Sequence, residues 1–237
     1  MYVIIAIFTM ALLLTILNSP GSALSLCHEG DLAALLDFKA SLINSPSTLA
    51  SWDENVSCCG WVGITCDGSS PARVLNISLH AKGLYGPLPQ ALGNIASLQT
   101  LNLSSNSLSG DIPSEFTALS RLQQLDLSSN NLSGELSVLA NLENLQVNNL
   151  TRNGFSGRVP SFTNLGSLLR FWASTNSLIG EVPSHMCQSS RYVETLDLSD
   201  NHLSGPLAEG LDVCSKLQVL NLATNSLHGR FLWISTT

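Results

Sequence analysis

Six cysteines are the residues of this sequence with the widest choice of chemistry. Four of them lie close together near the N-terminus and two stand apart: Cys27, Cys58, Cys59, Cys66, Cys187 and Cys214. Thiolates can bind zinc, but the first four contain no C-x₂-C pair, and the adjacent Cys58 and Cys59 cannot easily both face one tetrahedral ion. Disulfides are the favoured interpretation, and disulfides persist in oxidising compartments such as the secretory pathway.

Catalytic and metal chemistry have little support elsewhere in the chain. His28 stands beside Glu29, but no H-E-x-x-H motif follows that would place two histidines on one helix face. The sequence contains no V-A-I-K, H-R-D or D-F-G motif of a kinase and no G-x-S-x-G elbow of a hydrolase. We therefore predict no catalytic residue, no metal ion and no cofactor.

Five Asn-x-Ser/Thr sequons offer a different chemistry, since each is a candidate glycan acceptor in a secreted chain. They are Asn55, Asn76, Asn102, Asn131 and Asn149. Secretion itself is predicted from residues 1–23, an apolar stretch that ends in small residues and is typical of a cleaved signal peptide; the alternative is an uncleaved anchor, since no Lys or Arg precedes the apolar run. The net charge of −7 offers no electrostatic basis for binding nucleic acid.

The elements that position these residues come from one phrase that recurs along the chain. "LNLSSNSLSGDIP" at 101–113 returns as "LDLSSNNLSGEL" at 125–136, and weaker copies follow. The copies share one asparagine, at Asn106, Asn130, Asn153, Asn176, Asn201 and Asn225, and a degenerate first copy has Lys82 in that place. The intervals are 23 to 25 residues. A period this regular predicts a solenoid in which each repeat packs on its neighbours.

The repeating unit, L-x-x-L-x-L-x-x-N-x-L-x-G-x-[IVL]-P, is the pattern of leucine-rich repeats. It predicts an α/β solenoid, a right-handed superhelix with a parallel sheet on its concave face. Alternation places Leu101 and Leu103 inside and Asn102 and Ser104 outside. The shared asparagine offers an acceptor and two donors to neighbouring turns, so the six asparagines should form a hydrogen-bonded ladder.

Two residues depart from the unit. Ser137 stands where the proline is expected, and Asn148 stands where a core leucine is expected. A buried polar side chain without a partner costs about 1–3 kcal/mol. The repeat that contains Asn148 is therefore either the least stable one or has a locally bulged strand.

One outward column of the predicted concave face is a candidate binding surface. It consists of Ser78, Asn102, Asp126, Asn149, Trp172, Asp197 and Asn221. An outward tryptophan is unusual there, and Arg152 and Arg170 should lie close to it on the same sheet. Exposed aromatic and arginine side chains are typical binding anchors, so Arg152, Arg170 and Trp172 are the predicted partner-binding residues. The alternative is a tryptophan that lies flat on neighbouring side chains.

Residues 24–71 resemble the N-terminal cap of plant extracellular leucine-rich-repeat proteins. The resemblance rests on "CHEGDLAALLDFKASL" and "SWDENVSCCGWVGITCD". It implies a disulfide-bonded cap with the pairs Cys27–Cys58 and Cys59–Cys66, and Trp52 and Trp61 are best interpreted as its core. Residues 72–237 then hold about seven repeats, the last one incomplete.

The cysteine after "PSHM" and the next one a lengthened repeat later make the chain similar to the N-terminal ectodomain of phytosulfokine-receptor-like kinases, the plant receptors for sulfated peptides. This resemblance implies the pair Cys187–Cys214 and an extracellular recognition module whose full-length family resides at the plasma membrane. The partners it implies are a peptide or protein ligand and a co-receptor of the same repeat class.

The chain departs from that family because no island segment, membrane helix or kinase is found in its 237 residues. We expect a truncated product of a receptor gene. Its last residues, Phe231, Leu232, Trp233 and Ile234, would form an uncovered apolar patch that favours self-association. The alternative function is a secreted inhibitor, similar to polygalacturonase-inhibiting proteins, which share this cap and repeat.

Overall fold

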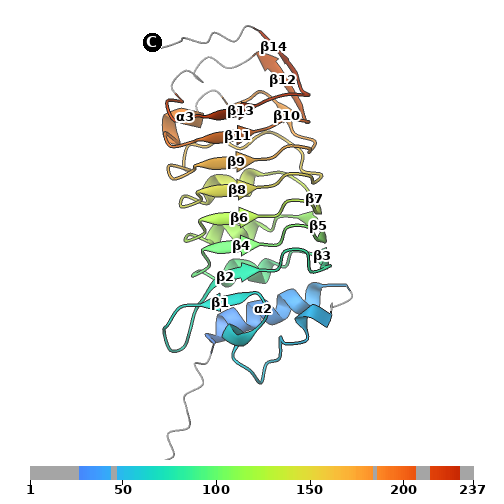
Figure 1. Cartoon of the computed structure of the whole chain (residues 1–237), viewed down its shortest axis with the longest axis vertical. Coiled ribbons are helices and arrows are strands. Elements are labelled where there is room, and N and C mark those ends of the chain that lie inside the picture. Colours follow the sequence, from blue (N-terminus) through green and yellow to red (C-terminus); the bar gives the residue numbers. More distant parts are fainter. Residues whose placement is uncertain (1–26, 44–46, 184–185, 207–213, 230–237) are drawn as a thin grey trace, which may run out of the picture.

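The protein is a stack of similar turns with a helical cap at one end (Figure 1). The computed structural model describes residues 27–43, 47–183, 186–206 and 214–229. Over these ranges no helix combines the length and the apolar character that a membrane span needs. The expected signal peptide and the expected apolar patch at 231–234 lie outside the described residues.

One sheet runs the length of the stack (Figure 1). Its eight strands, in spatial order, are β1 (Ile64–Cys66), β2 (Val74–Ser78), β4 (Thr100–Asn102), β6 (Gln124–Asp126), β8 (Val147–Asn149), β9 (Arg170–Trp172), β11 (Thr195–Asp197) and β13 (Val219–Asn221). Strand β1 belongs to the cap and is antiparallel to β2, whereas every later neighbour is parallel. The predicted parallel sheet is confirmed.

A second set of short strands follows each turn on another side of the stack (Figure 1). Strands β3 (Tyr85–Pro87), β5 (Ser107–Asp111) and β7 (Asn131–Ser133) form one sheet, and β10 (Ile179–Gly180), β12 (His202–Pro206) and β14 (Ser226–His228) form another. The "LSGxIP" segment builds these strands. Its glycine has positive φ, for example 78° at Gly134, where an added Cβ would lie 2.5 Å from the carboxyl carbon of Asp111.

Helices occupy the remaining side and the cap. Helix α2 (Glu29–Ser41) is the main helix of the cap, and α3 (Met186–Ser189) is a single turn. Short 3₁₀-helices span Ser47–Leu49, Cys58–Gly60, Gln90–Asn94, Ser114–Ala118 and Ser137–Asn141. The last of these begins at Ser137, the position where the repeat pattern expects proline.

The asparagine ladder joins consecutive repeats through backbone groups. Asn130 is representative: its Nδ2 donates to the carbonyls of Leu103 and Leu127, both at 3.0 Å, and its Oδ1 accepts from the N–H of Leu108 at 3.0 Å. The other five asparagines make the same kind of bonds to their own repeat and to the preceding one. Each amide thus satisfies main-chain groups that the turn would otherwise leave unpaired.

The residue before each ladder position adopts a left-handed backbone. Seven non-glycine residues have φ between 51° and 58°: Ala81, Ser105, Ser129, Arg152, Thr175, Asp200 and Thr224. This conformation is uncommon for residues with a Cβ. Because φ is similar in all seven residues, the side chain at this position leaves the backbone in a similar way in each repeat.

Asn148 lies in the core of the fourth repeat without a hydrogen bond. Its side chain is 0% exposed, and among the described residues neither its Nδ2 nor its Oδ1 has a partner. Strand β8 pairs regularly on both sides, with Asn148 opposite Leu125 and Phe171, so the predicted bulge is wrong. The other alternative, that this repeat is the least stable one, stays a prediction.

The cap is held by aromatic packing and by one ion pair to the first repeat. Trp52 lies between Phe38 and Trp61, with ring centroids 5.9 and 5.2 Å away. The carboxylate of Asp31 is fully buried and accepts from Nε and Nη2 of Arg73, both at 3.0 Å, and from the N–H of Val74 at 2.8 Å. The hydrogen bond to Asp31 raises the pKa of Arg73 above its usual value.

Candidate functional site

The predicted outward column exists as one aligned row across the eight-stranded sheet. Ser78 lies opposite Asn102, and Asp126, Asn149, Trp172, Asp197 and Asn221 follow in that order on successive strands. These side chains are exposed or partly exposed, whereas their strand neighbours Leu101, Leu125 and Leu196 are buried. We call this outer side of the sheet the sheet face.

Three of the seven column positions share one internal hydrogen bond. The residue two positions further on is a serine whose hydroxyl donates to the column side chain, at 2.7 Å in the pairs Ser104–Asn102, Ser128–Asp126 and Ser199–Asp197. The serine N–H donates to the same oxygen in each pair. In these repeats the hydroxyl hydrogen and the acceptor are both used within the protein.

Strands β8 and β9 interrupt this arrangement. The Oδ1 of Asn149 accepts the N–H of Thr151 at 3.2 Å, but the Thr151 hydroxyl does not donate to it. Trp172 offers no acceptor at all, so the hydroxyl of Ser174 pairs with that of Thr151 at 3.3 Å instead. Two hydroxyls share one hydrogen bond, so one O–H of the pair has no acceptor among the described residues.

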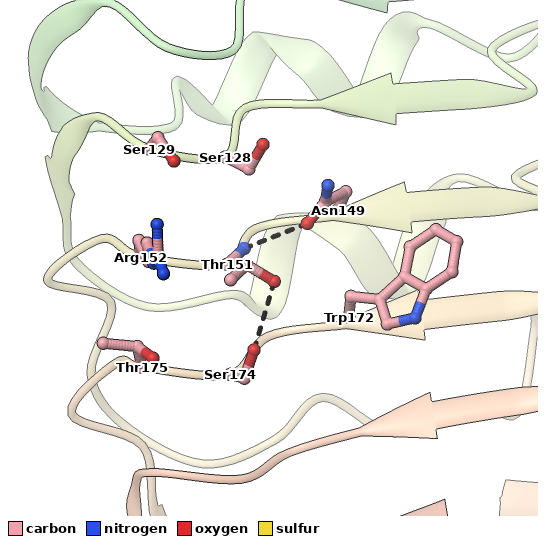
Figure 2. Close-up of a pocket in the computed structure, with 8 residues that line it drawn as sticks. All are labelled: Ser128, Ser129, Asn149, Thr151, Arg152, Trp172, Ser174 and Thr175. Atoms are coloured by element: carbon pink, nitrogen blue, oxygen red, sulfur yellow. Dashed lines mark hydrogen bonds between the residues drawn. The ribbon is translucent and has the colours of Figure 1, made fainter. Parts of the chain in front are cut away.

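A shallow hollow of about 380 Å³ opens at this interruption (Figure 2). It is lined by Ser128, Ser129, Asn149, Thr151, Arg152, Trp172, Ser174 and Thr175. Trp172 is partly buried and is one of the lining residues (Figure 2). The lining contains one cation and no carboxylate.

The two predicted arginines differ in their surroundings. Arg152 has a left-handed backbone, is exposed and lines the hollow, and within the described ranges its guanidinium makes no hydrogen bond or ion pair. Arg170 does not line the hollow, and its Nη2 lies 3.7 Å from a carboxylate oxygen of Glu194. The structure thus brings Arg152 and Trp172 together and leaves Arg170 on the same sheet outside the hollow.

A histidine–serine pair nearby was not singled out from the sequence. Nδ1 of His80 lies 2.9 Å from Oγ of Ser104. Because the Ser104 hydroxyl already donates to Asn102, His80 must donate to Ser104 and cannot act as its base. Ser104 is also only 4% exposed, contrary to the outward position expected for it, because these two bonds hold it against the sheet. The pair supports no nucleophilic chemistry.

Comparison with known proteins identifies both parts of the chain. Residues 28–67 match the leucine rich repeat N-terminal domain, residues 96–141 match the family of leucine rich repeats in two copies, and residues 192–214 match a single leucine rich repeat. Phytosulfokine receptor 1 of Arabidopsis thaliana is 34% identical over 228 residues, which are 96% of this chain and 20% of the receptor.

Solved structures of plant receptor ectodomains are also similar to this chain. The BIR2 ectodomain of Arabidopsis thaliana is 38% identical, with a TM-score of 0.65 over 72% of this chain and 92% of that one. The ectodomain of the Arabidopsis receptor kinase HAESA, solved with a peptide hormone ligand, is 31% identical, with a TM-score of 0.73 over 83% of this chain and 33% of that one. The chain belongs to the plant leucine-rich-repeat receptor-like proteins. It spans about a fifth of the length of phytosulfokine receptor 1 and a similar share of receptor 2.

Polygalacturonase inhibitor 2 of Arabidopsis thaliana is also similar to this leucine-rich-repeat chain, but over less of it. The two are 36% identical over 91 residues, which are 38% of this chain. The similarity to the phytosulfokine receptor therefore extends through the sheet face and its hollow, whereas the similarity to the inhibitor covers a minority of the chain.

The cysteines of this leucine-rich-repeat protein form three disulfides: Cys27–Cys58, Cys59–Cys66 and Cys187–Cys214. These are the pairs implied by the resemblance stated above. The sulfur atoms of Cys58, Cys59 and Cys66 lie within 4.8 Å of one another, but each is already bonded to another cysteine and none is a free thiolate ligand. His28 accepts the N–H of Gly30 at 3.2 Å and so caps α2 rather than forming a metal site.

The five sequons differ in accessibility. Asn55 in the cap and Asn131 at the start of β7 are exposed, whereas Asn76, Asn102 and Asn149 lie on the sheet face and are partly buried. Asn149 is both a sequon and a lining residue of the hollow. A glycan there would cover Trp172.

Proposed function

We propose that this chain is an extracellular recognition module of a plant receptor-like protein and binds a peptide or protein partner on its sheet face. The single observation that supports the proposal most is the hollow at β8 and β9, which is lined both by a partly exposed Trp172 and by Arg152, whose guanidinium has no partner among the described residues. Tryptophan and arginine are the residue types most enriched at binding hot spots. Two of the lining residues, Asn149 and Trp172, lie on the paired strands β8 and β9, so these two need little ordering on binding.

The setting of the module fits an extracellular role. Three disulfides hold the cap and the lengthened repeat near β11, as expected for a protein that folds in the secretory pathway. The related HAESA ectodomain is known with a peptide hormone ligand on the same fold. A co-receptor of the same repeat class is the second kind of partner that we propose for the sheet face.

No catalytic role is proposed for the chain. The fold is that of receptor ectodomains. In the histidine–serine pair on the sheet, His80 donates a hydrogen bond to Ser104 and so cannot accept its proton. The inhibitor function receives less support, because the similarity to polygalacturonase inhibitor 2 covers only 38% of this chain.

The proposal can be tested by selecting displayed random peptides on the immobilised full chain and comparing three proteins. The wild type should enrich peptides that lose binding to Trp172→Ser. They should keep binding to Tyr192→Ser, a matched control that removes an aromatic ring 61% exposed outside the hollow. Peptides that bind Trp172→Ser as well as wild type, or a selection without enrichment, would contradict recognition at this site.

A further inference from the structure

The hollow contains hydrogen-bond donors that have no acceptor in the protein. Within the part of the chain that the structure describes, the guanidinium of Arg152, Nδ2 of Asn149 and Nε1 of Trp172 have no hydrogen-bond partner. One O–H of the Thr151–Ser174 pair is also unused. Figure 2 shows these groups around the same opening.

The acidic side chains of the column lie on either side of the hollow and do not line it. The column has Asp126 on β6 and Asp197 on β11, but Asn149 and Trp172 occupy the two strands between them. Each aspartate also has its Oδ1 occupied by a serine hydroxyl and N–H of its own repeat. In a chain of net charge −7, this is a local surface with a cation, free donors and no acidic lining residue.

We propose that the hollow binds an acidic side chain of a peptide, with the carboxylate on Arg152 and an adjoining apolar group on Trp172. The proposal rests on the recognition function proposed above and specifies the chemistry of the ligand. A carboxylate accepts about four hydrogen bonds and can take the guanidinium in a bidentate pair, so it is complementary to these donors and opposite in charge to Arg152. The partly exposed indole gives a neighbouring apolar side chain a surface on which to bury area.

A pair of defined peptides tests this chemistry on the full, disulfide-bonded chain. Acetyl-Phe-Glu-Phe-amide and its isosteric counterpart acetyl-Phe-Gln-Phe-amide are titrated separately into ¹⁵N-labelled protein. The indole N–H signal of Trp172, assigned by its loss in Trp172→Phe, reports binding at the hollow. Arg152→Gln removes the proposed cation, and Arg158→Gln is the matched control, because Arg158 is an exposed arginine that does not line the hollow.

We expect the glutamate peptide to shift the Trp172 signal and to bind about tenfold more tightly than the glutamine peptide, the size of one charge-assisted hydrogen bond. The preference should vanish in Arg152→Gln, persist in Arg158→Gln, and vanish below about pH 4, where the peptide carboxylate is protonated. Equal binding of both peptides, equal loss in the two arginine variants, or no shift at all would overturn the proposal. Selected peptides that depend on Trp172 but not on Arg152 would overturn it and leave the recognition function standing.

Discussion

Replacing Asn148 by leucine should stabilise the protein, although it changes a fully buried residue. Both polar atoms of the Asn148 side chain lack partners, and its strand neighbours in the core are Leu125 and Phe171. Removing an unsatisfied buried amide recovers about 1–3 kcal/mol. Burying a leucine adds about 1.5–3 kcal/mol, and the greater volume of leucine opposes this with a packing cost of about 1–3 kcal/mol.

The net expectation for Asn148→Leu is a gain of about 2 kcal/mol in the free energy of unfolding. For a chain of this size that gain corresponds to a rise in Tm of about 4–8 °C. Urea unfolding with an unchanged m-value and a higher midpoint is the measurement. Asn164→Leu is the control, since Asn164 is exposed and the same substitution there should change stability by no more than about 0.5 kcal/mol.

A second variant separates polarity from volume. Asn148→Ala removes both unpaired polar atoms and adds no bulk, so it tests the polar term without overpacking. Loss of stability in both Asn148→Leu and Asn148→Ala would refute the reasoning, because it would mean that the amide has a stabilising partner such as an enclosed water. If Asn148→Leu loses stability while Asn148→Ala gains it, the core around β8 has too little space for a leucine side chain.

Further predictions concern covalent state, the cap and chemistry. Non-reducing peptide mapping should find three disulfides and no free thiol, and a bond from the cap to Cys187 would contradict the fold. Arg73→Met should lower the free energy of unfolding by about 3–5 kcal/mol in urea titrations, because it leaves the buried carboxylate of Asp31 unpaired; a loss below 1 kcal/mol would show that the other donors to Asp31 suffice. Intact-glycopeptide analysis should find Asn149 empty, since a glycan there would cover Trp172, and full occupancy would contradict binding at the hollow. Purified protein should hydrolyse no ATP above a blank, and turnover that survives repurification and depends on one residue would overturn the non-enzymatic role.

The repeat period made the large-scale geometry predictable. In a solenoid, residues one period apart in sequence become neighbours in space. The six ladder asparagines and the aligned column from Ser78 to Asn221 therefore follow from counting 23 to 25 residues. The same period predicts that Trp172 and Arg152 lie near each other.

The details that form the hollow were not predictable from single positions. Whether a hydroxyl is free depends on the residue two positions earlier and on the next strand: Ser128 is engaged because Asp126 precedes it, and Ser174 turns to Thr151 because Trp172 precedes it. The pattern also left open whether β8 was bulged, since an unsatisfied amide and a displaced strand have comparable costs. Regular pairing on both sides of β8 decided this question.

The unsatisfied buried amide and part of the proposed binding site belong to the same repeat. The segment "VNNLTRN" places Asn148 in the core, and the residues that follow supply Asn149, Thr151 and Arg152 to the hollow. Each outward change from the common pattern frees a donor, and the inward change leaves a buried amide unpaired. A scaffold of near-identical repeats gains a specific site only where one repeat differs from its neighbours, and local departures of this kind are expected at functional sites. Asn148→Leu therefore also tests whether peptide binding depends on the unsatisfied amide. If the hollow and the buried amide are independent, the glutamate peptide should bind this variant as tightly as the wild type.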